Sequence, residues 1–167
     1  MHACRWFALA LGLVVADQLS KFAARAHFQI GERLPLTDFF NLTLAYNFGA
    51  AFSFLAEAGG WQRIFFTLLA CAISGWISVM LWRHPEKRLQ NWALALIMGG
   101  AIGNVIDRIA HGAVVDFLDF HAGGLHWPTF NLADTGICMG AALLILDAWR
   151  SKDQKPELST SDTPPCS

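Results

Sequence analysis

Charged residues are scarce in this chain. They make up 15% of its 167 residues, whereas an average soluble domain has roughly 25%. The net charge is only −1 and the mean hydropathy is +0.39. This composition predicts a single domain in an apolar solvent, and nothing in it indicates a nucleic-acid partner.

The motifs of several catalytic and metal-binding classes are also missing. The four cysteines are scattered, without a CxxC pair, and are interpreted as small apolar fillers. There is no HExxH and no GxSxG, and three histidines of one loop lack a ligand pattern: His111, His121 and His126. We therefore expect no metal. A serine–lysine dyad is disfavoured because Ser20 and Lys21, adjacent on a helix, cannot face each other.

Long apolar runs predict an all-α membrane protein with four transmembrane helices. The expected spans are residues 6–26, 64–82, 91–110 and 132–149. The second of these has no charge over about the 20 residues that a membrane-crossing helix needs. Glycines in the third and fourth runs should let helices approach closely. A cleaved signal peptide is the alternative for the first run, but Asp17, Lys21 and Arg25 favour a helix with a buried polar face.

Basic residues in the short connections predict the orientation. Arg83, Lys87 and Arg88 lie between the second and third spans, and more basic residues follow the fourth. This places both termini in the cytoplasm. A set of basic residues on the other side argues against it: Lys21, Arg25, Arg33 and Arg63.

Two segments, residues 28–63 and 111–131, should then lie together on the outer side. The first alternates aromatic and β-branched residues with polar ones, which predicts a small β-rich platform between the first and second spans. The second is interpreted as a loop. The tail from Ser151 to Ser167 lacks the apolar residues to fold and is expected to be disordered.

Four aspartates should converge near the outer interface: Asp107, Asp116, Asp119 and Asp134. Two carboxylates held close cannot easily both ionise, so such a pair can activate water and hydrolyse an amide without metal. Which carboxylate holds the proton stays open.

Each of these acids also has an ordinary interpretation. Asp107 could pair with Arg108 or cap a helix, and Asp134 could cap the fourth helix. Asp119 is expected to be solvated in a loop, and Asp116 could be a simple loop acid. Asp17, one turn before Lys21, predicts a structural ion pair.

Five segments resemble, in order, the motifs of the lipoprotein signal peptidases, also called signal peptidase II. They are DQLSK (17–21), YNFGAAFSF (46–54), GNVIDR (103–108), VVDF (114–117) and FNLADTG (130–136). The resemblance implies an aspartic endopeptidase of the bacterial cytoplasmic (inner) membrane, without a cofactor, that cuts diacylglyceryl-modified prolipoproteins just before the lipidated cysteine. It also implies contact with membrane lipid and sensitivity to globomycin-like inhibitors.

The resemblance selects the catalytic pair, which it places on Asp116 and Asp134, near the outer face. It implies supporting or substrate-binding roles for seven further residues: Asp17, Lys21, Asn47, Asn104, Asp107, Arg108 and Asn131. The segment 47–54 is expected to cover the site. The alternative from another class is a small proton-coupled transporter, in which membrane aspartates relay protons.

Overall fold

The computed structural model describes residues 3–49 and 60–153, with side chains up to residue 150. Residues 50–54 of the expected platform, Cys166 and the rest of the tail after Asp153 lie outside the described residues.

Within the described residues, four helices are long and apolar enough to cross a membrane. They are α1 (Cys4–His27), α2 (Trp61–Arg83), α3 (Arg88–His111) and α4 (Leu132–Asp153). Each contains one of the runs found in the sequence and extends it by one to four residues at one or both ends. Helix α4 continues three residues beyond Arg150, into the segment for which the sequence predicts disorder.

Helix α3 is the centre of the bundle and packs against the three other helices. Small residues allow the close approach: a methyl group on Gly99 would lie 2.8 Å from the Ala10 backbone oxygen of α1, and one on Gly140 of α4 would lie 2.6 Å from the Ala93 oxygen of α3. Trp6 of α1 is buried in the core, and its Nε1 donates to the backbone oxygen of Pro85 in the α2–α3 connection at 3.2 Å. The first apolar run is therefore an integral helix of the bundle.

The strands form one antiparallel sheet in the order β1-β2-β3-β4. They are β1 (Arg33–Thr37), β2 (Phe40–Asn47), β3 (Val114–Ala122) and β4 (Leu125–His126). The expectation of a platform from the first segment alone is thus incomplete, since β3 and β4 come from the segment interpreted as a loop. Residue Asn47 pairs with Val114 and Phe40 with Phe120, a long-range pairing that local sequence periodicity does not reveal.

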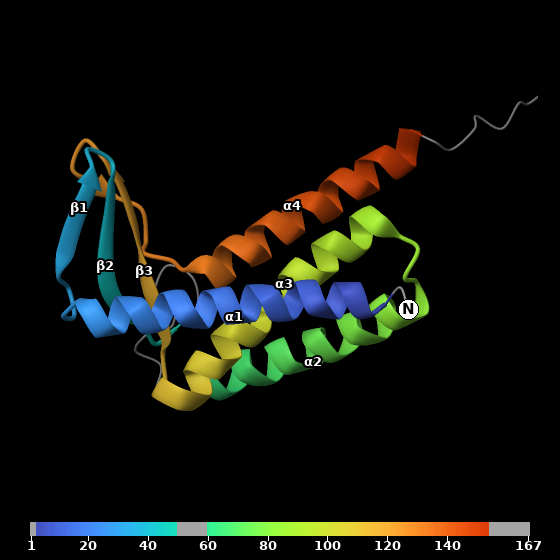
Figure 1. Ribbon diagram of the computed structural model, residues 1–167, viewed down its shortest axis with the longest axis horizontal. Coiled ribbons are helices and arrows are strands. Elements are labelled where there is room, and N and C mark those ends of the chain that lie inside the picture. The colour runs from blue at the N-terminus through green and yellow to red at the C-terminus, as the bar shows by residue number, and fades with distance from the viewer. Residues whose placement is uncertain (1–2, 50–59, 154–167) are drawn as a thin grey trace, which may run out of the picture.

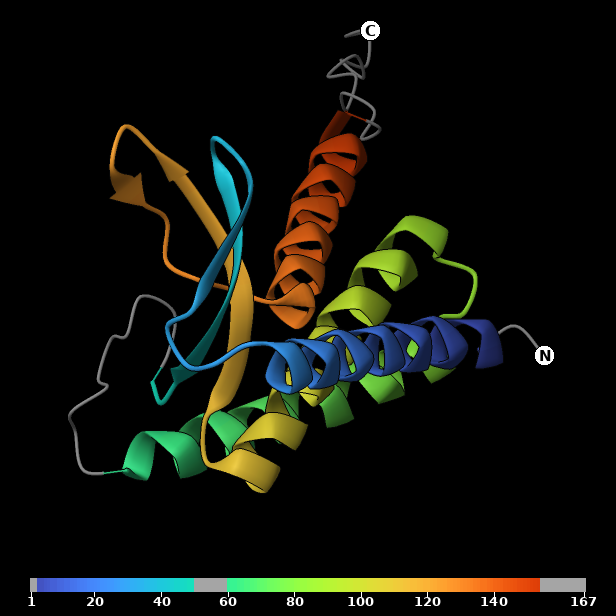
Figure 2. The same ribbon diagram turned by 60° about the vertical axis from the view of Figure 1, so that its left-hand side comes forward.

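The sheet lies at one end of the bundle, where α1 and α3 end and α4 begins (Figures 1 and 2). The N-terminal end of α1, the α2–α3 connection and the far end of α4 lie at the opposite end. Apolar side chains such as Leu11, Leu68 and Ile145 are exposed along the helices, as expected for surfaces that face lipid tails. The fold therefore has apolar surfaces along its helices and a sheet at one end.

Candidate active site

Asp116 and Asp134 come from two elements that meet at the sheet end of the bundle. Asp116 lies on β3 and is 1% exposed. Asp134 lies in the first turn of α4, where it lines a cavity between the helices and the sheet. The segment that connects β3 to α4 is therefore what sets the two carboxylates relative to each other.

Asn131 connects the two carboxylates at the start of α4. Its Nδ2 donates to Asp116 Oδ1 at 2.7 Å, and its Oδ1 accepts from the backbone N–H of Asp134 at 2.9 Å. The second contact is the N-cap of the helix. One fully buried amide thus caps α4 and anchors the strand carboxylate, so capping is done by Asn131 and leaves the Asp134 carboxylate available.

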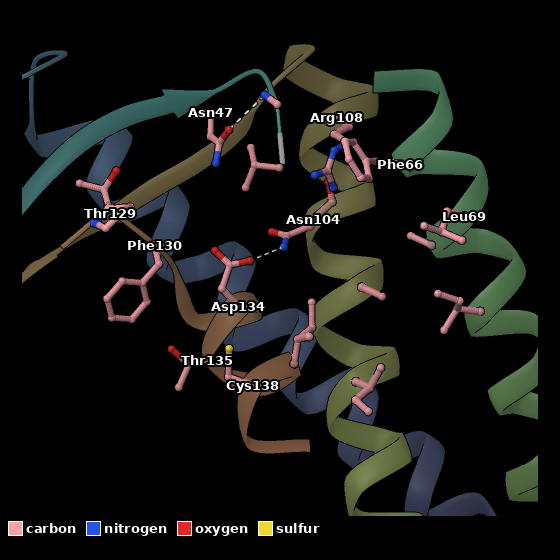
Figure 3. A pocket seen from close by; sticks show the side chains of 18 of the residues that line it. Asn47, Phe66, Leu69, Asn104, Arg108, Thr129, Phe130, Asp134, Thr135 and Cys138 are labelled. Atoms are coloured by element: carbon pink, nitrogen blue, oxygen red, sulfur yellow. Dashed lines mark hydrogen bonds between the residues drawn. The ribbon is translucent and has the colours of Figure 1, made fainter. Parts of the chain in front are cut away.

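Asn104 of α3 holds that carboxylate. Its Nδ2 donates to Asp134 Oδ1 at 2.8 Å, and its Oδ1 accepts from Lys21 Nζ at 3.0 Å (Figure 3). Because an ammonium group can only donate, Lys21 fixes the direction of the amide. Asn104 must therefore present N–H groups to Asp134.

Lys21 is buried in a cluster of charges between α1 and α3. Its Nζ lies 2.7 Å from Asp17 Oδ2 and 2.8 Å from Asp107 Oδ2. Asp17 also accepts the backbone N–H of Ala133, and Asp107 accepts that of Val115. These carboxylates therefore tie α1 and α3 to the elements that carry the candidate pair.

Gln18 belongs to this cluster and was not selected from the sequence. Its Nε2 donates to Asp107 Oδ1 at 3.0 Å and lies 3.3 Å from Asp17 Oδ2. The sequence signal for Gln18 is its place beside Asp17 in the DQLSK motif. One lysine neutralises two carboxylates only in part, and an amide N–H group can donate to both of them.

Asn47 and Arg108 complete the polar end of the site. Asn47 Nδ2 lies 3.3 Å from Asp116 Oδ2. Arg108 donates to the Asn104 backbone oxygen at 3.4 Å, and its guanidinium lies 5.7 Å from the centre of the Phe66 ring. Both line the cavity, as Figure 3 shows.

Burial, followed in size by the negative charge of Asp134, raises the pKa of Asp116 to about 7. Hydrogen bonds from Asn131 and Asn47 and the charge of Lys21 act in the opposite direction. Asp116 therefore changes its charge in the neutral range, which is where a general acid or base is most useful.

The cavity beside Asp134 measures about 680 Å³. Its walls away from the polar end are apolar and come from three helices: Leu69 and Ile73 of α2, Ile97 of α3, and Ile137 and Met139 of α4. Residues 127–130 and Val114 form its wall on the sheet side. A molecule with a polar reacting bond and an apolar remainder fits this shape.

One interpretation from the sequence is wrong. Asp119 is not a solvated loop acid, because it lies on β3 and is 1% exposed. Asp107 is an ion-pair partner, as expected, and its partner is Lys21 rather than the adjacent Arg108, since consecutive helix residues point in different directions. The predicted pair of Asp17 and Lys21 is confirmed.

The described residues contain no group of three or more histidine, cysteine or acidic side chains placed to hold a metal ion. The described cysteines, Cys4, Cys71 and Cys138, are free and exposed. The geometry consists of two carboxylates, three asparagines that donate to them, a buried charge cluster around Lys21, and an apolar cavity.

Comparison with known proteins gives one consistent result. The signal peptidase (SPase) II family matches residues 9–150. A lipoprotein signal peptidase of Ralstonia nicotianae is 59% identical over 145 residues, covering 87% of this chain and 84% of the relative. One of Yersinia enterocolitica is 51% identical over 159 residues, covering 95% and 94%.

A solved structure of a bacterial membrane enzyme has the same fold. It superposes with a TM-score of 0.81 at 28% sequence identity, over 94% of each chain. A second structure of a bacterial membrane enzyme gives 0.75 at 27% identity, over 95% of this chain and 94% of the other. The chain is therefore a multi-pass membrane protein.

Proposed function

The chain belongs to the signal peptidase II family, and from that premise we propose that it is an aspartic endopeptidase with Asp116 and Asp134 as its catalytic pair. Its substrates are diacylglyceryl-modified prolipoproteins, cut just before the lipidated cysteine. The observation that carries the proposal is the connection of a buried Asp116 and a cavity-lining Asp134 through one asparagine, Asn131. The peptidase names of the relatives do not favour the transporter alternative.

In this mechanism the two carboxylates share one proton. The ionised carboxylate takes a proton from a water molecule, which attacks the carbonyl carbon of the scissile bond, and the protonated carboxyl donates to the carbonyl oxygen. Collapse of the tetrahedral intermediate breaks the C–N bond. The carboxyl that took the proton of the water gives it to the leaving amine, and the other carboxylate takes back its proton from a hydroxyl group of the intermediate. The assignment of the first proton belongs to the pair rather than to one residue.

The other polar residues orient the pair and the substrate. Asn104 and Asn131 donate to the carboxylates, and Lys21, with Asp17 and Asp107, keeps Asn104 in that direction. Asn47 and Arg108 line the cavity where the substrate backbone would pass. We assign positioning to the buried charges of Lys21, Asp17 and Asp107, and substrate binding to Asn47 and Arg108.

The apolar walls of the cavity suit the signal peptide and the acyl chains. Leu69, Ile73 and Ile137 extend from the polar end toward the middle of the helices, so the scissile bond would stay near the interface while the apolar parts remain in the bilayer. We place the chain in the bacterial cytoplasmic membrane with both termini in the cytoplasm. The basic residues at the end opposite the sheet, among them Arg83, Arg88 and Arg150, support this orientation.

The test is cleavage of a purified diacylglyceryl-modified prolipoprotein by wild type, Asp116→Asn and Asp134→Asn. Both variants keep the side-chain shape but cannot share a proton as the pair does, so we expect a loss of at least about 10²-fold in kcat. Globomycin, added to the wild type, should inhibit.

The matched control is Asp147→Asn, in the same helix as Asp134 but about 20 Å farther along it. We expect it to cut at the wild-type rate. Retained cleavage by the folded Asp116 and Asp134 variants would show that the pair is assigned wrongly, and a wild type that cuts nothing would reject the substrate class.

A further inference from the structure

Asp119 is a buried carboxylate that the mechanism does not use. It lies on β3, and each of the other three strands contributes one side chain to it. Asn41 Nδ2 of β2 donates to Oδ2 at 2.9 Å, His126 Nδ1 of β4 donates to Oδ1 at 2.8 Å, and Arg33 Nε of β1 lies 3.5 Å from Oδ2. Both carboxylate oxygens are therefore occupied by donors.

The charge of this carboxylate is kept despite its burial. Burial by itself raises the pKa of Asp119, but the hydrogen bonds from Asn41 and His126, with the charges of His126 and Arg33, outweigh it and lower the pKa. Asp119 is thus an ionised anchor at neutral pH, and hydrogen bonds to an ionised group are the stronger kind.

Strand β4 needs such an anchor. It has only two residues, Leu125 and His126, and is joined to β3 through Gly123 and Gly124, both with positive φ. A two-stranded hairpin of this length is marginal in stability by itself. Its backbone pairs with His121 and Ala122, at the exposed end of β3. The contact of His126 with the buried Asp119 therefore does much to fix where β4 lies.

The four residues that follow β4 form the sheet-side wall of the cavity: Trp127, Pro128, Thr129 and Phe130. Trp127 N–H donates to the Phe120 oxygen at 2.7 Å and Phe130 N–H donates to the Leu118 oxygen at 3.1 Å. Between these two contacts the wall has no regular secondary structure, and His126 directly precedes it in the chain. A change in the position of β4 is thus transmitted directly to the wall.

We propose that Asp119 is a positioning residue for substrate binding, which holds the cavity wall at residues 127–130 through its contact with His126. This inference rests on the proposed function, since it concerns the affinity of the same site for its substrate. The two aspartates of β3 then have different roles. Asp116 takes part in catalysis, and Asp119, three residues later, sets the shape of the cavity.

The prediction is a change in KM rather than in kcat. In His126→Ala and Asp119→Ala the wall loses a charged hydrogen bond, so KM for the diacylglyceryl-modified prolipoprotein should rise roughly tenfold. The value of kcat should stay within about twofold, because Asn131 holds Asp116 and Asp134 through separate contacts. The pH profile of kcat should be unchanged.

The conservative variant His126→Gln keeps an N–H donor and should restore most of the wild-type KM. The control is Asp38→Asn, an exposed carboxylate in the turn between β1 and β2, which should behave as wild type. The double variant His126→Ala/Asp119→Ala should raise KM no more than Asp119→Ala alone, since the contact that His126→Ala removes is already lost there.

The outcomes separate the two proposals. If the wild type cuts nothing, the proposed function fails and this inference with it. If the wild type cuts but His126→Ala has an unchanged KM, or loses kcat at constant KM, only this inference is overturned. Since His126 is partly exposed, its substitutions test the inference even where Asp119→Ala does not fold.

Discussion

Each asparagine around the candidate pair has its amide direction fixed by a second contact. Lys21 occupies the oxygen of Asn104, the N–H of Asp134 occupies that of Asn131, and the N–H of Gly49 occupies that of Asn47 at 3.1 Å. The nitrogen ends must therefore face the carboxylates. Donors that cannot flip favour a negative charge on the pair, which offsets part of the cost of burying two acids together.

This balance predicts a pH dependence for cleavage. A carboxyl is protonated below its pKa and ionised above it, and the pKa of Asp116 is about 7. A pair that needs one proton loses it as the pH rises through that value. We expect kcat/KM to fall on the alkaline side of about pH 7, measured from pH 5 to 9 in one detergent.

Substitution of Asn47 tests whether the pKa of Asp116 causes this alkaline limb, the fall in kcat/KM at high pH. The hydrogen bond from Asn47 lowers the pKa of Asp116, so Asn47→Ala should raise the pKa and move the alkaline limb to higher pH. Tyr46→Phe, the neighbouring position on β2, is the control and should leave the profile in place. An alkaline limb that stays fixed in Asn47→Ala contradicts this account.

At the residue scale the sequence identified the carboxylates but could not choose among them. Asp116 and Asp119 are three residues apart in similar surroundings, and only the pairing with β2 and β4 decides what each one contacts. The resemblance to the family selected Asp116 and Asp134. The contact of His126 with Asp119 depends on the pairing of β3 with β4, so no local pattern predicts the role of His126.

At the element scale, the helices were predictable and the sheet only in part. Hydropathy is a local property, and the spans expected from it lie within four residues of the observed ends. Strand β3 was missed because it is buried over most of its length and carries two aspartates at positions that a local pattern assigns to a loop. Its partner β2 is about 70 residues away in the sequence, beyond the reach of periodicity.

Close packing of α3 against α4 leads to a prediction about the stability of the helix bundle. A methyl group on Gly100 would collide with the Ala133 backbone oxygen of α4, next to Asp134. Because a backbone oxygen cannot rotate away, Gly100→Ala should lower the free energy of unfolding by about 1–3 kcal/mol. It should also reduce cleavage by moving Asp134 away from Asn104.

The matched control is Gly75→Ala, in α2, where an added methyl group meets no atom within 4 Å. Alanine is also the better helix former by up to about 1 kcal/mol. The two variants are compared by thermal unfolding in detergent and by cleavage rate. Equal stability of the two would mean that α3 and α4 separate easily at this contact.

At the scale of the whole molecule, the fold separates polar chemistry from apolar binding. The candidate pair and its polar neighbours lie beside the sheet, while the cavity extends along α2, α3 and α4. A hydrolase for a membrane-bound peptide needs both, because the scissile bond must meet water while the remainder stays in the bilayer. This separation places the sheet at one aqueous interface, and the basic residues at the opposite end support the proposed orientation with the sheet on the outer side.

Site-specific labelling tests that orientation directly. In a chain whose four cysteines are replaced by alanine, single cysteines are introduced by Asp38→Cys, in the exposed turn between β1 and β2, and by Glu86→Cys, in the exposed connection between α2 and α3. A membrane-impermeant maleimide added to intact bacterial spheroplasts should label Asp38→Cys at once. It should label Glu86→Cys only after the membrane is permeabilised, because the proposed orientation, which rests on the basic residues Arg83, Lys87 and Arg88, places that connection in the cytoplasm. Immediate labelling of Glu86→Cys with protection of Asp38→Cys would reverse the orientation and place the candidate pair at the cytoplasmic face. Two cysteines labelled equally in intact spheroplasts would show that the chain is inserted in both directions, as a weak charge bias allows.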